Sequence, residues 1–532
     1  MRQALQTALI LAVFSCCTVT PIVSFAQQPA TPTAAPRFDI NRFAITGNTL
    51  IPAADLDRAV EPFTGKGKDF GDVQRALDAV EQAYRSRGYG SVQVLLPEQD
   101  ITKGVVQLRV LEPRIGRVVI EGNQFFNADN IRYGLPSIKE GETPSSAAMS
   151  RNLQVLAEHP TKQTSLTLRA GASEDQVDVG VKIADQKPTR FFFTLDNTGT
   201  SETGYWRTGF GYQHTNLFNK DHVLTAQYIT SPTEVDKVTI LGVGYRIPYY
   251  QWNSTLDLIA GYSDVNSGTV QGLFNVAGSG IIYAARWNYY LPRWGEAEQK
   301  VTFGLDYREF RNNVTFSGSS IVPDVTVRPA SLTYSGLRRF SDGEVSYYAS
   351  IAQNVPGGPD GGASSFTASR PGATENYTIV RYGGNYVRTL GRDFQIRAAV
   401  NGQETNSLLV SGEQFGVGGP DSVRGYLLRE ASGDRGFQTQ LELYTPDLAG
   451  KTGLSDNYRL RFLTFYDYGS YDYNSPPPGT IVHDSIYSVG LGMRMSYKKL
   501  VSLRVDVAQI MQPTVNRQSD STRVTGVLAI VY

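Results

Sequence analysis

An arginine stands in the longest glycine-punctuated gap of the chain. Residues 418–430 read GGPDSVRGYLLRE, and Arg424 lies among them, in a region that otherwise reads as strand after strand. Two interpretations are open. Arg424 is either a solvated side chain in a surface loop or a guanidinium group aimed inward at a partner, and such groups bond most strongly to carboxylates. The elements around this gap have to decide between the two.

Residue types used in catalysis show no arrangement that indicates an active site. The chain has four histidines, His159, His214, His222 and His483. None of them has metal-ligand spacing, and no G-x-S-x-G sequence lies near them. The segment LAGKTG resembles the end of a phosphate-binding loop, but Thr445 replaces its first glycine, so Gly450–Thr452 is interpreted as a tight turn. We therefore expect no enzyme and no bound metal or cofactor.

Length and charge limit the possible functions. A chain of 532 residues is too long for one ordinary core, so two or more units are expected. It has 50 basic and 50 acidic residues, which removes any whole-chain electrostatic argument for nucleic-acid binding. Its 30 tyrosines favour places where an apolar surface meets water, including membrane interfaces. A tyrosine-rich soluble β-protein is an alternative that composition leaves open.

The first 26 residues have the features of a secretory signal peptide. Arg2 precedes an apolar run from Ala8 to Phe14, and a small-x-small site ends at Ala26, after which residues 27–36 form a linker rich in proline and alanine. A lipoprotein acylated at Cys16 would need Phe14 at a position that prefers small residues. No later stretch approaches about 20 consecutive apolar residues, so a mature chain that enters a membrane must do so as strands.

Two similar segments precede the strand-rich region. FAITGNTLIPAADLDRAV begins at Phe43 and VVIEGNQFFNADNIRYGL at Val118, and each places a short strand, a Gly-Asn turn and a helix in the same order. A second helix and two strands complete each unit. The apolar stripes of these second helices are Val73, Leu77, Val80 and Tyr84 in the first unit and Met149, Leu153 and Leu156 in the second. We predict two β-α-α-β-β modules, with a generic pair of α+β domains as the alternative.

From Thr189 onward the helical period gives way to strands. About sixteen segments of roughly ten residues follow, and many of them alternate apolar and polar residues. In VSLRVDVAQ, Val505 and Val507 face one way while Arg504 and Asp506 face the other. A soluble sandwich would also alternate, but its strands would be shorter, near about 5 or 6 residues.

The connections between these strands alternate in length. Short ones such as LFNKD, RFSDGE and TLGRD alternate with long ones such as NVPGGPDGGASSFTASRPGATEN. Outer-membrane barrels show this pattern, with short periplasmic turns and long external loops. Aromatic residues gather at the short turns in YRIPYYQW and WNYYLPRW, as an interfacial girdle requires, and the last strand, RVTGVLAIVY, would close the barrel. This alternation places Arg424 in an external loop.

With two modules, a barrel and SVRGY in the gap after the eleventh strand, the sequence resembles the TpsB transporters of two-partner secretion, the ShlB/FhaC/HecB family. The resemblance covers nearly all of the mature chain. It implies two periplasmic α+β polypeptide-transport-associated (POTRA) domains, at residues 37–113 and 114–187, and an all-β transmembrane barrel of sixteen strands at residues 188–532. It also implies that the barrel lies in the bacterial outer membrane, with the N-terminal domains in the periplasm.

Two motifs carry the resemblance. The first is V-R-G-Y in the sixth external loop, here Val423, Arg424, Gly425 and Tyr426. The second is F-x-D-x-G on the thirteenth strand, here Phe465, Asp467 and Gly469. Asp467 shares the parity of Arg459 and Arg461, so it points into the lumen with the other charged side chains. If the sixth loop folds inward, Arg424 can form a charge-assisted bond with Asp467.

The resemblance implies export of a large partner protein, usually an adhesin, a haemolysin or a toxin, without nucleotide hydrolysis. The POTRA domains would add an extended segment of the unfolded partner to a sheet edge. The candidate substrate-binding region comprises Val73, Leu77, Tyr84, Val92 and Val94. We expect a monomer that contacts outer-membrane lipid and, during biogenesis, the barrel-assembly machinery. The prolines of residues 27–36 argue against the N-terminal plug helix that family members often have.

Two other functions fit parts of the sequence. An insertase that folds other barrels would share the VRGY loop and the barrel, but two modules rather than three or five argue against it. A passive porin would have no use for the modules. The neighbouring gene discriminates between the transporter and the insertase, since a gene for a very large exported chain beside this one favours the transporter and an isolated gene favours the insertase.

Overall fold

The computed structural model of this chain describes residues 36–264, 268–270, 274–276, 279–311, 315–316, 319–320, 324–476, 482–514 and 521–532. The predicted signal peptide and nearly all of the predicted linker lie outside the described residues. The chain divides into two compact units. The first unit contains the chain up to Thr46 together with residues 50–80 and 94–109. The second unit contains residues 47–49, 81–93 and 110–532.

The first module has the predicted order of strands and helices. Its elements are β2 (Arg42–Thr46), α1 (Ala53–Val60), α2 (Phe70–Ser86), β4 (Gln93–Leu95) and β5 (Val105–Leu111). The sheet order is β2-β5-β4, with β2 parallel to β5, so β4 is an edge strand. A two-stranded sheet of β1 (Phe38–Ile40) and β3 (Gly65–Lys68) is absent from the prediction, because the GKGK sequence of β3 has low strand propensity.

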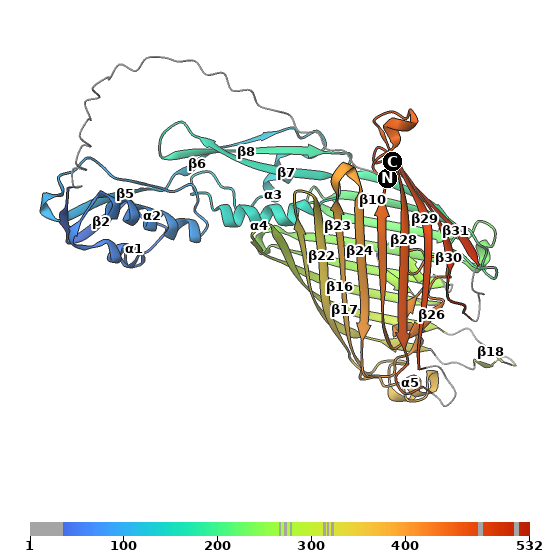
Figure 1. The fold of residues 1–532 in the computed structure, drawn as a ribbon. Helices are drawn as coiled ribbons and strands as arrows, with labels where there is room; N and C mark the ends of the chain where they lie inside the picture. Colours follow the sequence, from blue (N-terminus) through green and yellow to red (C-terminus); the bar gives the residue numbers. More distant parts are fainter. Residues whose placement is uncertain are drawn as a thin grey trace, which may run out of the picture. The chain divides into compact units, whose positions relative to one another are not determined.

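The second module repeats this topology (Figure 1). Its elements are β6 (Arg114–Glu121), α3 (Ala128–Tyr133), α4 (Ser146–Ala157), β7 (Lys162–Ala170) and β8 (Gln176–Asp185). The sheet order is β6-β8-β7, with β6 parallel to β8 and β7 antiparallel to β8. Asn127 and Ser145 cap the N-termini of α3 and α4, because each side chain accepts a hydrogen bond from the backbone N–H three residues later. The domain boundaries at 113 and 187 stay a prediction.

The remaining strands form a closed antiparallel barrel, as predicted. They are β9 (Thr189–Asp196), β10 (Arg207–Leu217), β11 (His222–Thr230), β12 (Ile240–Tyr249), β13 (Ser254–Asp264), β16 (Ser279–Trp294), β17 (Ala297–Arg311), β20 (Val325–Val327), β21 (Pro329–Arg339), β22 (Gly343–Asn354), β23 (Thr378–Thr389), β24 (Gln395–Glu404), β27 (Arg435–Tyr444), β28 (Tyr458–Asp472), β29 (His483–Tyr497), β30 (Val501–Ile510) and β31 (Thr522–Val531). β20 and β21 both pair with β17 and form one interrupted strand, which gives 16 strands in all. β31 pairs with β9 and closes the barrel.

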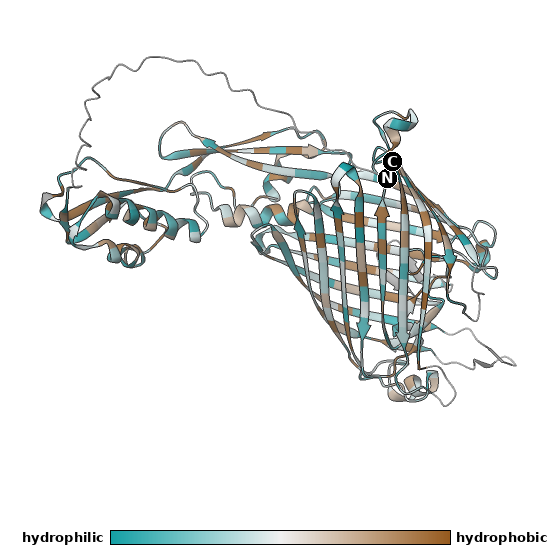
Figure 2. Ribbon diagram, viewed as in Figure 1, coloured by the Kyte–Doolittle hydropathy of each residue, from teal (hydrophilic) through white to brown (hydrophobic). Residues whose placement is uncertain are grey.

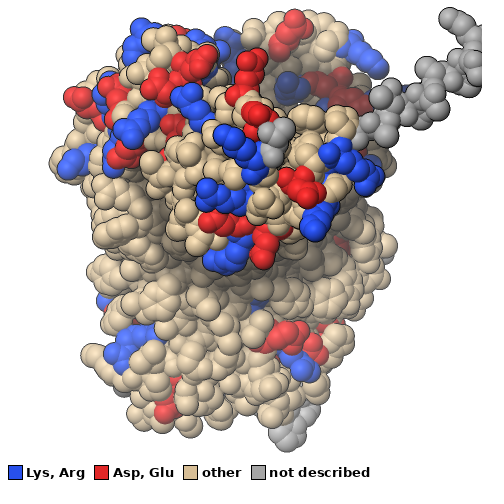
Figure 3. Space-filling model, turned by 90° about the vertical axis from the view of Figure 1, so that its left-hand side faces the viewer, with Lys and Arg blue, Asp and Glu red and all other residues tan. Residues whose placement is uncertain are grey.

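The barrel wall alternates between an apolar outer face and a polar lumen. Leu491 and Val507 are 67% and 41% exposed on the outside, whereas Asp467 and Asp506 are 0% and 1% exposed on the inside. Apolar and polar positions accordingly alternate along the strands (Figure 2). In the space-filling view, a broad region of the barrel wall is almost free of acidic and basic side chains (Figure 3). Among the described residues, none of the helices has the length and apolar content needed to span a membrane.

The long connections contain short elements that the sequence does not predict. The connection between β22 and β23 carries α5 (Ala363–Ser369), whose Phe366 is fully buried beside Phe310 and Tyr377. Two others carry the pairs β14 (Gly268–Val270) with β15 (Phe274–Val276) and β18 (Thr315–Phe316) with β19 (Ser319–Ser320). The gap that contains Arg424 holds a pair of short strands, β25 (Phe415–Val417) and β26 (Ala431–Gly433).

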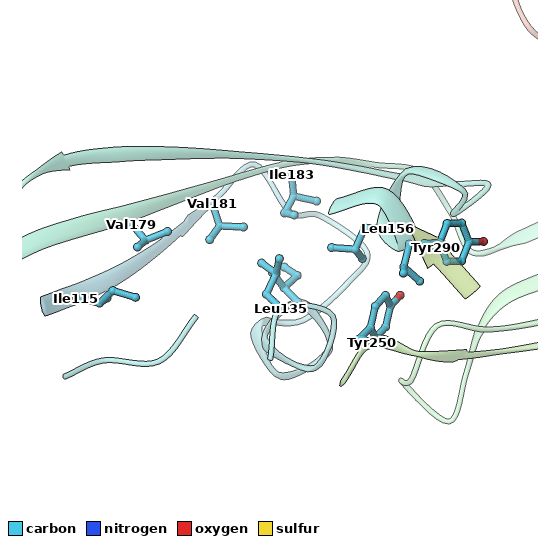
Figure 4. Packing of buried hydrophobic residues seen from close by; sticks show 10 residues of the cluster. Ile115, Leu135, Leu156, Val179, Val181, Ile183, Tyr250 and Tyr290 are labelled. Carbon is cyan, nitrogen blue, oxygen red and sulfur yellow. The ribbon is translucent and has the colours of Figure 1, made fainter. Parts of the chain in front are cut away.

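The apolar core of the second module is completed by two tyrosines of the barrel. Tyr250, in the turn after β12, and Tyr290, on β16, belong to the same buried cluster as Leu135, Leu156 and Ile183 of the module (Figure 4). Both tyrosines are 4% exposed. Tyr250 and Tyr290 are therefore not part of the predicted aromatic girdle at the short turns, because they contact protein and not lipid. The core of the second module is therefore completed by side chains of the barrel.

A buried ion pair lies at the same junction. Lys162 Nζ, on β7, donates to both carboxylate oxygens of Asp221, at 2.7 and 2.6 Å, and these side chains are 1% and 0% exposed. Asp221 lies in the short turn between β10 and β11, where it also accepts from Asn130 Nδ2 at 2.8 Å and from the Tyr250 hydroxyl at 2.7 Å. Burial lowers the pKa of His159, 3.6 Å from Asp221, to about 4, so this ring is neutral at neutral pH.

Candidate functional site

The loop between β25 and β26 lies against the inner wall of the barrel and buries Arg424. The guanidinium group donates to both oxygens of Asp467, with Nε to Oδ2 and Nη2 to Oδ1 each at 2.7 Å. The backbone N–H of Arg424 donates to the same carboxylate at 3.1 Å. The two side chains are 1% and 0% exposed. The structure thus places Arg424 and Asp467 together in a bidentate, charge-assisted pair.

Two further carboxylates complete the surroundings of Arg424. Glu442, on β27, accepts from Nη1 at 2.7 Å, and Asp506, on β30, lies 3.6 Å from the same nitrogen. The ring of Phe465 lies under the guanidinium group, with 3.6 Å between Cζ and the ring centroid, as in a cation–π contact. Neither Glu442 nor Asp506 belongs to a sequence motif. Strand parity placed Asp506 in the lumen, and that is the signal that could have indicated it.

Arginines on neighbouring strands balance these additional carboxylates. Glu442 accepts from Arg397 of β24 at 3.0 Å, and Asp506 lies 2.8 Å from Arg494 of β29 and 2.9 Å from Arg504 of β30. Charges of both signs therefore alternate around this part of the lumen. Two loop residues belong to this network, Arg424 and Asp421, which lies 2.7 Å from Arg504, so the loop is linked to five neighbouring strands through charged groups.

The other V-R-G-Y residues also hold the loop against the barrel wall. Val423 is fully buried beside Val417 and Ile510, and the Tyr426 hydroxyl donates to the backbone carbonyl of Gln512 at 2.7 Å. Gly425 has a φ of +95°, a backbone conformation that residues with a Cβ rarely adopt. The tetrapeptide thus supplies one charged side chain, one apolar side chain, one hydroxyl donor and one left-handed backbone position.

Gly469 leaves room for the loop, and this leads to a testable prediction. A Cβ at this position would lie 2.2 Å from Val417 Cγ1 and 3.1 Å from Val423 Cγ2. We expect Gly469→Ala to displace the loop at a cost of about 1–3 kcal/mol and to raise the conductance of the protein in planar bilayers. Gly526→Ala is the matched control, because a Cβ on this other barrel strand would meet nothing within 4 Å. Equal, low conductance for both variants would contradict the prediction.

The candidate substrate-binding side chains of the first module are mostly in its interior. Val73, Tyr84, Val92 and Val94 are between 0% and 4% exposed, and Leu77 is half-buried. A binding segment would therefore meet the backbone edge of β4 and the exposed side chains beside it, rather than these residues. The role of the region stays a prediction.

The segments considered for catalysis lie in a turn and in polar contacts of the barrel. Ala449–Thr452 forms one 3₁₀ turn between β27 and β28, as the tight-turn interpretation requires. Among the described residues there is no group of three or more His, Cys, Asp and Glu side chains that could hold a metal ion. Nδ1 of His222 lies 2.7 Å from the Tyr245 hydroxyl, and His483 pairs with Asp472 at 2.9 Å.

Comparison with known protein families identifies the family to which this architecture belongs. A model of the haemolysin secretion/activation proteins ShlB/FhaC/HecB matches residues 175–495, and a model of the ShlB-type POTRA domain matches residues 38–113. The chain belongs to the ShlB/FhaC/HecB family. As in this family generally, the protein is an outer-membrane β-barrel transporter whose N-terminal POTRA domains lie in the periplasm.

Relatives of the ShlB/FhaC/HecB family match over most of the chain. The heme/hemopexin transporter protein HuxB of Haemophilus influenzae is 21% identical over 486 residues, which cover 88% of this chain and 82% of HuxB. The structure of CdiB from Escherichia coli has a TM-score of 0.76 at 18% identity and covers 95% of this chain and 93% of CdiB. CdiB from Acinetobacter baumannii has a TM-score of 0.69 at 16% identity and covers 94% and 90%. At these identities the structures show a shared fold.

Proposed function

We propose that this chain captures one large, unfolded partner protein in the periplasm and exports it through its barrel, as a transporter of two-partner secretion. One observation carries the proposal: the buried Arg424 cluster fastens a loop inside a closed barrel, in a chain whose N-terminal modules have sheets with edge strands. A loop held by polar contacts can be released without unfolding the barrel wall. A passive porin has no use for the modules.

The edge strand β4 supports capture by the first module. Within the three-stranded sheet β4 has only β5 as a neighbour, so its other side can add an extended segment. Leu95 is 38% exposed beside this edge, while Val94 is buried. Main-chain hydrogen bonds supply most of the affinity in such a complex, which suits a partner that is still unfolded.

The proposal needs no nucleotide. The GKT segment that resembles a phosphate-binding loop is the turn between β27 and β28. A partner that folds outside the cell cannot return through the barrel as an extended chain, so its folding free energy can give export a direction. HuxB is named for heme/hemopexin transport and the family for haemolysin secretion and activation, which supports a partner of the haemolysin, adhesin or toxin class.

Deleting residues 37–113 tests capture by the first module. We expect export of the partner to fall to background, because its unfolded segment then has no edge on which to pair before it reaches the barrel. Export is measured as the amount of partner in the medium, and barrel assembly by heat-dependent migration of the outer-membrane protein.

The same experiment has an informative control. A chain with Arg58→Ala keeps the first module intact, since Arg58 is 75% exposed and pairs only with the nearby Asp55 in the described contacts. Normal export by this variant and none by the deletion would support the proposal. Continued export after the deletion, with a normally assembled barrel, would refute capture by this module.

A further inference from the structure

The loop makes a further charged contact, on strands that the Arg424 cluster does not use. Glu413, just before β25, is 1% exposed. Its carboxylate lies 2.7 Å from Arg308 Nη1 on β17 and 3.3 Å from Arg381 Nη2 on β23. Gln403 Nε2 fixes the same residue by donating to its backbone carbonyl at 2.9 Å. The loop is therefore fastened by a carboxylate at its base as well as by a guanidinium group at its tip.

A polar cavity of about 410 Å³ adjoins Glu413 between the loop and the wall. Its charged lining consists of Arg286, Arg308, Arg381 and Arg429 against Asp306 and Glu413. Four positive groups against two negative ones leave an excess of two positive charges. A cavity of this composition attracts carboxylates and repels ammonium and guanidinium groups.

The two fastenings differ in how accessible they are. The Arg424 side chain is 1% exposed, whereas those of Arg308 and Arg381 are 14% and 33% exposed. In addition, Nε of Arg308 is buried and has no hydrogen-bond partner among the described residues. This arginine can therefore donate a hydrogen bond to one more acceptor group without losing an existing bond. A carboxylate that enters the lumen reaches Arg308 and Arg381 more easily than it reaches Arg424.

We propose that Arg308 and Arg381 form a binding site for acidic side chains of the exported polypeptide, which replace Glu413 there and free the base of the loop. The exchange conserves the charged pairs on the wall, because one carboxylate leaves as another arrives. Arg424 stays bound during this step, so the loop turns about its tip instead of leaving the barrel. This inference rests on the proposed function and identifies which cargo residues open the channel.

The test uses the full-length protein in planar bilayers, with peptides added on the side of the POTRA domains. The probe is a soluble peptide of alternating glutamate and glycine, and the matched peptide has glutamine in place of glutamate. We expect the glutamate peptide to raise the open probability at least about tenfold over the glutamine peptide, since bonds to charged groups are the stronger ones. Glu413→Gln should be open without peptide and should not respond further.

A second variant controls for general effects of neutralising a carboxylate. Glu309→Gln lies on the same strand as Arg308, but Glu309 pairs with Arg311 at 2.6 Å and is outside the cavity lining. We expect this variant to stay closed and to respond to the glutamate peptide as the unaltered protein does. Heat-dependent migration confirms that each barrel has assembled.

Two results would overturn the inference. Equal responses to the glutamate and glutamine peptides would show that the site does not select carboxylates, and a closed Glu413→Gln channel would show that Glu413 does not hold the loop. Export in cells separates this outcome from failure of the proposed function. Continued export of the partner by the unaltered protein leaves the transporter role intact, whereas its absence would remove both.

Discussion

Arg424→Ala should open the channel and strongly reduce export. The change leaves Asp467, Glu442 and Asp506 buried without the guanidinium group that bridges them. Removal of one partner from a buried ion pair typically costs about 3–5 kcal/mol, enough to release the tip of the loop. Single-channel recording should show larger and more frequent openings, and the amount of partner in the medium should fall.

Two comparisons make this result specific. Arg424→Lys keeps the charge but cannot donate in a bidentate manner to Asp467, so its conductance should lie between those of the alanine variant and the unaltered protein. Arg459→Ala removes an arginine from the same strand as Asp467, at a position that is 76% exposed, and should change neither property. If Arg424→Ala left both conductance and export unchanged, the contacts of Arg424 with the barrel wall would have no role in gating.

Lys162→Met should loosen the second module from the barrel. It leaves Asp221 buried with its other donors but without its cation, and we expect this to cost about 3–5 kcal/mol. Limited proteolysis between residues 157 and 221 should become much faster, and thermal unfolding should show a separate early transition. The barrel itself should still migrate in its compact, heat-sensitive form.

A double variant and a surface variant check the cause. Lys162→Met with Asp221→Asn removes both charges, so it should be less destabilised than Lys162→Met alone. Lys139→Met, in the same module, removes a cation that is 64% exposed and should change stability by less than about 1 kcal/mol. Equal protease resistance for Lys162→Met and the unaltered protein would mean that the apolar core alone holds the junction.

The barrel and the Arg424–Asp467 ion pair could be predicted from the sequence because they depend on local patterns. Strand alternation, short and long connections and the two motifs are enough to bring Arg424 and Asp467 within reach of each other. Strand parity indicates only that Glu442 faces the lumen, and no motif connects it with Arg424; Glu413 lies outside the barrel strands, where neither parity nor a motif marks it. The contact of Tyr250 with the second module could not be predicted either, because the aromatic residues around it in the sequence indicate a lipid interface.

Helix α5 shows a second limit of sequence-based prediction. Its seven residues, ASSFTAS, have weak helix propensity, and Phe366 gives no apolar period by itself. The helix forms because Phe366 packs into a cluster made from β17, β20 and the segment near Leu409. Tertiary contacts of this kind decide the structure of a loop that reads as irregular.

Asp221, in the turn between β10 and β11, contacts Lys162 of the second module, and this contact limits how the module and the barrel can be exchanged separately in evolution or by design. A chimera that joins this module to the barrel of a relative would also have to carry the first short turn, Tyr250 and Tyr290, since these complete the charged contact and the core. Recombination at the predicted border near residue 187 would cut through one compact unit, whereas an exchange of the whole segment Val110–Tyr532 would keep the second module and the barrel together.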